Sequence, residues 1–160
     1  MEVDFISVKP EETRELSECR RKVWLTTYRG IYPDKMLDEF DYEFHDNKNL
    51  RMINSEEFSV CFIISGGEKA GYLIIRHTDP LYIQSLYLLE NFRRKGIGRK
   101  TFDYVREHCE KSGIKKFYLG CHPQNSKALG FYKKMGGKIT AYDLGHENNN
   151  ENNVKIEFEV

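Results

Sequence analysis

The alternation of hydrophobic and polar residues along the chain predicts seven β-strands. Short runs rich in β-branched and aromatic residues, such as "EFSVCFII", are typical of buried strands. The closing stretch "VKIEFEV" alternates apolar with charged residues, so one face of that strand is expected to meet water. The strands are expected at residues 3–8, 57–64, 70–78, 81–89, 115–120, 138–144 and 154–160.

Apolar residues that recur every three or four positions predict the helices. In one of them the apolar positions are Phe102, Val105 and Cys109, and Gly113 follows as an end signal. The polar stretch "GHENNNENN" (145–153) is expected to be a mobile loop. The helices are expected at residues 10–28, 34–54, 98–112 and 125–135.

The order of these elements predicts a mixed α/β fold (an α+β mixed sheet). Two strands flank the turn "SGGEK" and form an antiparallel hairpin. The strand–helix–strand unit at 81–120 is expected to be a right-handed parallel crossover. With no internal repeat and no linker, residues 1–160 are expected to form a single domain with helices on both sides of the sheet.

Composition narrows the class of function. The 25 basic and 25 acidic residues cancel, which disfavours a protein that coats nucleic acid. The start "MEVDFISVKPEE" lacks the basic and apolar regions of a signal peptide, and no apolar run approaches the roughly 18 residues of a membrane span. Four scattered cysteines without a CxxC pair indicate free thiols in a reducing cytoplasm. Cys121 and His122 are neighbours, but no second cluster completes a metal site.

The basic stretch "NFRRKGIGRKT" (91–101) is the strongest candidate for a binding loop. The dinucleotide motif fails because Thr101 stands where its third glycine belongs, and the Walker loop fails because Arg99 separates glycine from Lys-Thr. A glycine-rich basic loop that follows a strand and opens a helix still presents free backbone N–H groups and positive potential. It can bind a pyrophosphate, or it can be a solvated basic helix cap.

Two segments together resemble the GNAT superfamily of N-acetyltransferases. "FRRKGIGRK" matches the R/Q-x-x-G-x-G signature, and "NSKALGFYKKMGG" resembles the downstream segment of the family. The element order agrees over nearly the whole chain, and "WLTTYRGIYPDKMLDE" (24–39) is similar to the acceptor wall of small-molecule and polyamine-type members. The matching positions are Arg93, Gly96, Gly98, Asn125, Ala128, Phe131, Tyr132 and Gly136.

The resemblance implies a mostly antiparallel central sheet with one splayed parallel strand pair, and acetyl-CoA as cofactor. The pantetheine arm of coenzyme A would lie between strands 81–89 and 116–120, where backbone groups of the first strand pair with it. The basic loop would surround the pyrophosphate. The cofactor-binding residues implied are Leu86, Tyr87, Leu88, Arg93, Arg94, Lys95, Gly96, Ile97, Gly98, Arg99, Asn125, Ala128 and Tyr132.

The resemblance also implies catalytic roles. The N–H of Leu88 would polarise the thioester carbonyl, and Tyr132 would act as general acid on the departing thiolate. Tyr132 also lies on an apolar helical stripe, so core packing is the competing interpretation. For the general base, the Asp and Glu residues in 34–46 and His122 all stay open. Transfer through Cys121 is disfavoured because no activating partner accompanies it.

The acceptor is expected to be a small primary amine: a polyamine, an antibiotic or an amino-acid-like compound. Members that acetylate protein N-termini often carry a Glu where this chain has Gly120. Trp24, Tyr28 and Tyr32 could bind the amine through cation–π contacts or could pack in the core. Gly137 stands where the family often has a Phe, and this difference either leaves room near the acceptor or has no consequence.

The sequence does not exclude two other functions. The absence of an obvious base also fits a non-catalytic coenzyme A-binding sensor or assembly module, and acetylation of a protein or peptide amine is a further alternative. A homodimer is compatible with the sequence, and neither nucleic acid nor membrane is expected as a partner.

Overall fold

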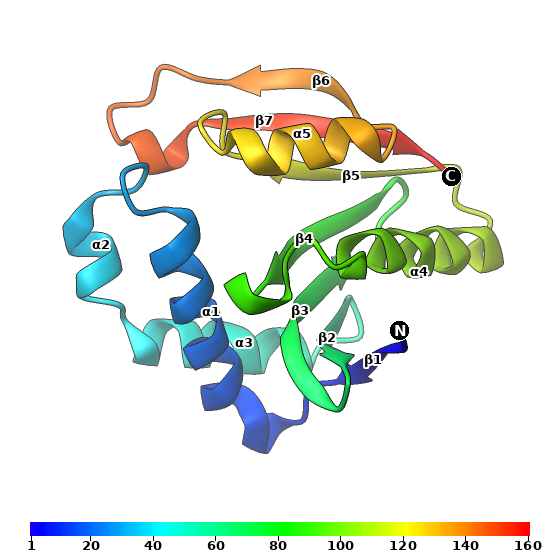
Figure 1. The fold of residues 1–160 in the computed structure, drawn as a ribbon, viewed down its shortest axis with the longest axis horizontal. Coiled ribbons are helices and arrows are strands. Elements are labelled where there is room, and N and C mark those ends of the chain that lie inside the picture. Colours follow the sequence, from blue (N-terminus) through cyan, green and yellow to red (C-terminus); the bar gives the residue numbers. More distant parts are fainter.

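A computed structural model describes residues 1–160, and its strands form one sheet in the order β1-β2-β3-β4-β5-β7-β6 (Figure 1). Neighbouring strands are antiparallel except β4 and β5, which are parallel. The mixed, mostly antiparallel sheet expected from the sequence is thereby confirmed. The strands are β1 (Val3–Ser7), β2 (Phe58–Ser65), β3 (Glu68–Arg76), β4 (Leu81–Leu88), β5 (Lys116–Cys121), β6 (Lys138–Asp143) and β7 (Asn153–Glu159).

Helices cover both faces of this sheet. None of them combines the length and the apolar composition that crossing a bilayer requires. The α-helices are α1 (Thr13–Thr27), α2 (Asp34–Asp38), α3 (Tyr42–Ile53), α4 (Ile97–Ser112) and α5 (Ser126–Lys134), and the short 3₁₀ helices are η1 (Pro10–Glu12), η2 (Glu90–Phe92) and η3 (Asn149–Glu151).

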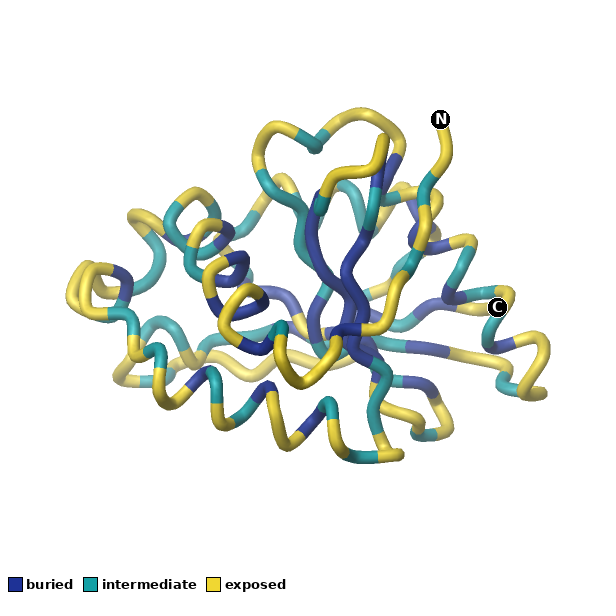
Figure 2. Tube along the Cα trace, turned by 90° about the horizontal axis from the view of Figure 1, so that it is seen from below, coloured by how far each residue is buried: buried dark blue, intermediate teal, exposed yellow.

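Two hydrophobic cores form because successive side chains of a strand point to opposite faces. In β3, Leu73 and Ile75 pack into the larger core with α4 and α5, whereas Tyr72 and Ile74 pack into the smaller core under α1 and α3. Phe102 of α4 is fully buried in the larger core, and burial of such a side chain contributes about 2–3 kcal/mol. Figure 2 shows the buried residues concentrated on the central strands and on the inner sides of the helices.

The single helix expected over 34–54 is wrong, because the chain breaks it into α2 and α3. The side chain of Asp41 accepts a hydrogen bond from the N–H of Phe44 (3.0 Å) and caps a new helix. Phe40, which lies between the two helices, packs edge-on against Trp24, with the ring centroids 5.6 Å apart. The aromatic contact and the cap together favour two short helices over one long one.

The polar segment 145–153 contains η3 and is tied to the rest of the protein. Asn149 Nδ2 donates to the carbonyl of Ile31 (2.8 Å) and to Oε1 of Gln124 (2.7 Å). Asn152 Oδ1 accepts from the N–H of His146 (3.1 Å). The polar composition that suggested a mobile loop thus supplies hydrogen bonds that connect this segment to the loop after α1 and to the turn before α5.

Candidate active site

The strands β4 and β5 separate after a short parallel ladder. Their pairing is limited to residues 81–83 against 117–119, and Figure 1 shows the two strands diverging beyond that point. The register of β3 against β4 shifts so that Ile75 faces Ile83 but Ile74 faces Ser85. Gln84 is therefore a β-bulge, and a bulge bends its strand. The bend carries the second half of β4 away from β5.

Beyond the bulge, β4 keeps unpaired backbone groups on its open side. The N–H of Leu89 donates to the carbonyl of Ala70 (2.8 Å). Backbone groups of an antiparallel ladder alternate in direction, so Leu86 and Leu88 direct theirs away from β3. The carbonyl of Leu88 already accepts from Arg93 Nε, so the groups that remain to pair with an extended ligand are the N–H of Leu88 and both backbone groups of Leu86.

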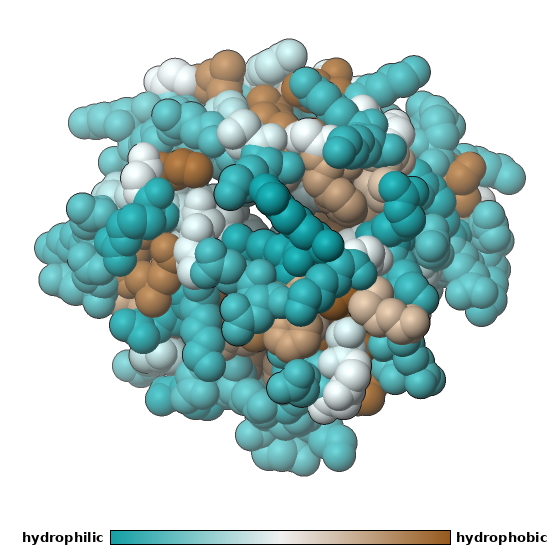
Figure 3. Space-filling view, in the orientation of Figure 1, coloured by the Kyte–Doolittle hydropathy of each residue, from teal (hydrophilic) through white to brown (hydrophobic).

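A small cavity occupies this gap. It brings together side chains from α1, from both diverging strands and from the start of α5. The hydrophilic face in Figure 3 is hollowed in the same region, between α1 and α5. The lining residues are Tyr28, Ile83, Gln84, Ser85, Leu86, Tyr87, Leu119, Gly120, Cys121, Asn125 and Tyr132.

The basic loop forms the entrance to α4. Arg94 and Gly96 both adopt left-handed backbone conformations, with φ of 60° and 82°. A non-glycine residue in this region stores about 1–2 kcal/mol of strain, and such strain concentrates at functional sites. The first N–H groups of α4 have no partner within the helix. Arg94, Lys95 and Arg99 are exposed around them. The loop thus combines free N–H groups with positive charge, and anion binding there stays a prediction.

Arg93 and Gly98 have structural roles that the sequence did not reveal. Arg93 Nε donates to the carbonyl of Leu88 (3.0 Å), and its Nη2 donates to Oγ1 of Thr27 (3.0 Å) and Thr26 (3.3 Å). A Cβ added to Gly98 would lie 2.9 Å from the ring of Phe131. Gly98 therefore permits close packing of α4 against α5, in addition to any approach by a ligand.

Asn125 and Tyr132 reach the cavity from α5. Asn125 Oδ1 accepts the N–H of Ala128 (3.4 Å) as the helix cap, which leaves its Nδ2 free to donate. Tyr132 is half-buried and lies against Phe102 and Phe158 (6.1 and 6.3 Å between ring centroids). Its hydroxyl makes no hydrogen bond within the protein, and burial raises its pKa. The side chain both packs and presents a protonated hydroxyl to the cavity.

The acids that sequence reasoning kept open as general bases lie elsewhere. Asp34 and Asp38 bind Arg29 (3.0 and 2.8 Å), and Asp41 caps α3. The carboxylate of Asp46 binds Arg14 (2.8 Å) and Ser17 (2.6 Å). Neither these acids nor Glu39 and Glu43 line the cavity.

His122 is held in one tautomer. Its Nδ1 accepts the N–H of Gln124 (3.1 Å), so its Nε2 carries the proton and donates to the carbonyl of Asn149 (2.8 Å). With both ring nitrogens engaged, His122 has no free position for a substrate proton.

The neighbouring Cys121 does line the cavity, but burial raises the pKa of its thiol to about 12. A protonated thiol is a poor nucleophile, which supports the rejection of a cysteine route.

An aromatic cluster borders the cavity on the α1 side. Tyr28 and Tyr32 stack at 3.9 Å between ring centroids, and Trp24 meets both edge-on. The hydroxyl of Tyr28 lies 2.7 Å from that of Tyr87. Of the three residues expected to bind substrate, Tyr28 lines the cavity, while Trp24 and Tyr32 support it from behind.

Two glycines near the site leave space that side chains of β7 occupy. A Cβ on Gly120 would lie 2.7 Å from Nδ2 of Asn153, and one on Gly137 would lie 2.6 Å from Cγ2 of Ile156. The room that we expected at Gly137 is therefore filled by the core. Sequence reasoning also missed Gln84, since no local signal marks a bulge within an apolar run.

The comparisons with known proteins agree with this geometry. Residues 16–137 match the model of the acetyltransferase (GNAT) family. A spermidine N(1)-acetyltransferase of Thermoplasma acidophilum is 24% identical over 149 residues, which cover 89% of this chain and 92% of the relative.

Solved structures show the same fold. The PaiA N-acetyltransferase of Thermoplasma acidophilum, solved with coenzyme A, superposes with a TM-score of 0.85 at 22% identity over 100% of both chains. The microcin C7 self-immunity acetyltransferase MccE, solved with acetyl-CoA and AMP, has a TM-score of 0.74 at 16% identity, covering 99% of this chain and 93% of its own. With its family match, its split β4–β5 pair and its glycine-rich basic loop, the chain belongs to the GNAT family of N-acetyltransferases, which use acetyl-CoA as donor.

Proposed function

We propose that this enzyme transfers an acetyl group directly from acetyl-CoA to the primary amine of a small molecule. The observation that carries the proposal is the cavity between β4 and β5, where unpaired backbone groups, Asn125 and Tyr132 meet. The spermidine acetyltransferase among the relatives supports a small amine as acceptor.

Binding of the donor is assigned to three parts of the site. The backbone groups of Leu86 and the N–H of Leu88 pair with the extended arm, and the free Nδ2 of Asn125 donates to it. The loop 94–99 and the first turn of α4 bind the pyrophosphate through N–H groups and positive charge. The side chain of Arg93 fixes the end of β4 instead of contacting the phosphates, because it already binds Leu88.

The chemistry of transfer needs an electrophile, a proton donor and a neutral amine. Acetyl-CoA supplies a reactive thioester. The amine nitrogen bonds to the acetyl carbon, and the N–H of Leu88 stabilises negative charge on the acetyl oxygen. As the C–S bond breaks, the hydroxyl of Tyr132 gives its proton to the departing sulfur and takes up the proton that the acylated nitrogen releases, so the products are the amide and the free thiol. An aliphatic amine has a pKa of about 10.4 in water. Because no carboxylate lines the cavity, the amine loses its proton to solvent before it enters.

The test is a thiol-release assay with acetyl-CoA and a panel of amines. We expect turnover with small amines. In the Tyr132→Phe variant, kcat should be lower by about a hundredfold, and the Kd for coenzyme A should be unchanged. Lys133→Met, at an exposed position next to Tyr132 on the same helix, serves as a control for nonspecific effects on α5. Turnover with peptides alone would contradict a small-molecule acceptor, and full activity of Tyr132→Phe would remove this residue from the mechanism.

A further inference from the structure

Arg20 of α1 places a positive charge in the interior without an acidic partner. Only 6% of this residue is exposed. Its Nη2 donates to Oδ1 of Asn49 (3.1 Å), and its Nε has no hydrogen-bond partner. The guanidinium lies 5.1 Å from the ring centre of Tyr72. A buried charge normally has a counter-ion, and this one has an amide and an aromatic ring instead.

The acid to which Arg20 is connected by hydrogen bonds is already neutralised. Asn49 connects Arg20 to Ser17, whose hydroxyl donates to Asp46 (2.6 Å). Asp46 in turn forms an ion pair with Arg14 (2.8 Å). The chain of hydrogen bonds therefore ends on a carboxylate that has its own cation, and the charge of Arg20 is left available.

Two further polar atoms around Arg20 are also without partners. They are the hydroxyl of Tyr72, a residue with no exposed surface, and Nδ1 of His45, a residue that is 7% exposed. Buried polar groups are paired in the great majority of cases, and exceptions call for a ligand or another explanation. Three such atoms from α1, α3 and β3 gather in one region beneath the helices.

Lys48 adds a second cation to the same region. It is half-buried on α3, and its pKa is lowered by burial and then by the charges of Arg20 and Arg51. No carboxylate forms an ion pair with it. Two cations that repel each other without an intervening acid favour the binding of an anion.

This region adjoins the cavity through a row of tyrosines. The rings of Tyr72 and Tyr87 are 5.5 Å apart, and the hydroxyls of Tyr87 and Tyr28 are 2.7 Å apart. Tyr28 and Tyr87 both line the cavity between β4 and β5. The Arg20 region and the cavity are therefore neighbours, separated by this row of tyrosine side chains.

We infer that the acceptor carries a carboxylate as well as its amine, and that Arg20, Lys48 and the Tyr72 hydroxyl bind this carboxylate. The inference rests on the proposed function and narrows its acceptor to an amino-acid-like compound. A polyamine has only positive groups and would meet two cations without an acid. The specificity would then differ from that named for the spermidine-acetylating relative.

Matched acceptors that differ by one carboxylate test the inference. Ornithine is compared with putrescine, lysine with cadaverine, and tyrosine with tyramine, in the thiol-release assay. In the pair that the enzyme prefers, we expect kcat/KM for the acceptor with the carboxylate to be at least about tenfold higher than for its decarboxylated partner. A tenfold difference corresponds to the contribution of one charge-assisted hydrogen bond. Equal or higher values for the decarboxylated partners would overturn the inference and leave the proposed function intact. No turnover with any amine would overturn both.

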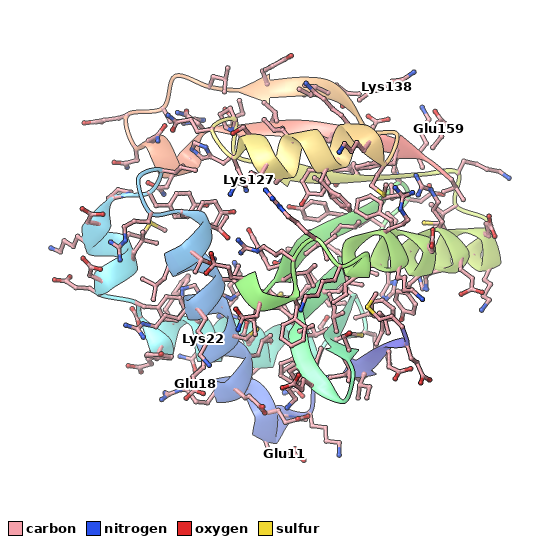
Figure 4. All side chains as sticks on the ribbon, viewed as in Figure 1. Glu11, Glu18, Lys22, Lys127, Lys138 and Glu159 are labelled. Atoms are coloured by element: carbon pink, nitrogen blue, oxygen red, sulfur yellow. The ribbon has the colours of Figure 1, made fainter.

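Variants separate recognition from folding. Lys48→Met removes a half-buried charge, and Arg20→Gln removes the buried one. Lys22→Met is the matched control, because Lys22 lies exposed on α1 in Figure 4. We expect Lys48→Met and folded Arg20→Gln to raise KM for the acceptor that carries the carboxylate. The ratio of kcat/KM for this acceptor to that for its decarboxylated partner should fall by about tenfold, whereas Lys22→Met should leave the ratio unchanged. A purely structural role would affect both acceptors equally. If Arg20→Gln does not fold, an unchanged preference in Lys48→Met alone overturns the inference.

Discussion

Gly71 offers a direct test of how β3 positions the second half of β4. A Cβ at this position would lie 2.0 Å from the carbonyl oxygen of Tyr87 and 2.9 Å from Cα of Leu88. Ordinary contacts of this kind are about 3.3 Å, so the two strands would have to separate by roughly 1 Å. Both obstructing atoms belong to the backbone, and rotation of a side chain cannot relieve the contact.

The expected loss of stability in Gly71→Ala follows from this displacement. Separation of the strands stretches ladder bonds such as that from Leu89 N–H to the carbonyl of Ala70, now 2.8 Å. Two such bonds contribute about 1 kcal/mol each, and overpacking adds about 1–3 kcal/mol. Alanine regains about 0.5–1 kcal/mol over glycine in a strand. The net decrease in the free energy of unfolding is expected to be about 2–4.5 kcal/mol.

Urea denaturation measures this change as a lower midpoint at a constant slope. Gly130→Ala is the control, because a Cβ there meets nothing within 4 Å and alanine in the interior of α5 should stabilise by about 0.5–1 kcal/mol. We also expect Gly71→Ala to weaken coenzyme A binding, since Leu88 moves. A Gly71→Ala protein as stable as the parent would refute the reasoning.

Two other predictions concern titratable side chains. Burial, followed by the charge of Arg20, lowers the pKa of His45 from 6.5 to about 4. Between these pH values the unfolded chain binds a proton that the folded protein does not, so the free energy of unfolding should fall as the pH drops from 6.5 to 4. Urea titrations at several pH values should show a smaller slope for His45→Gln, and an identical slope would contradict this account. The raised pKa of Cys121 predicts that Cys121→Ala keeps acetyl transfer within about tenfold of the parent, and a larger loss with intact folding would point to a covalent role.

Regular elements could be predicted from the sequence because each signal is local. All seven strands were expected within a few residues of their places, and Gly113 ends α4 with φ of 71° as its position indicated. The break between α2 and α3 was missed because it depends on the distant contact of Phe40 with Trp24. A periodic pattern does not show where tertiary contacts interrupt it.

The site could be predicted in outline for a different reason. The two matching segments identified the loop 93–99 and the helix that carries Asn125 and Tyr132, because their residue spacing is preserved. The bulge at Gln84 and the buried Arg20 were not predicted. Both depend on how β3, β4 and α3 come together, and neither has a sequence pattern that separates it from an ordinary strand or an exposed helical arginine.

The Arg93 side chain couples the donor side of the site, at the end of β4, to the acceptor side, at the end of α1. One guanidinium holds the end of β4, at Leu88, and the last turn of α1, at Thr26 and Thr27. A ligand that shifts the end of α1 therefore also changes the free energy of binding at Leu88. By thermodynamic reciprocity, the donor must change the affinity for the acceptor by the same factor. The coupling between the two substrates thus depends on a single side chain that contacts neither of them.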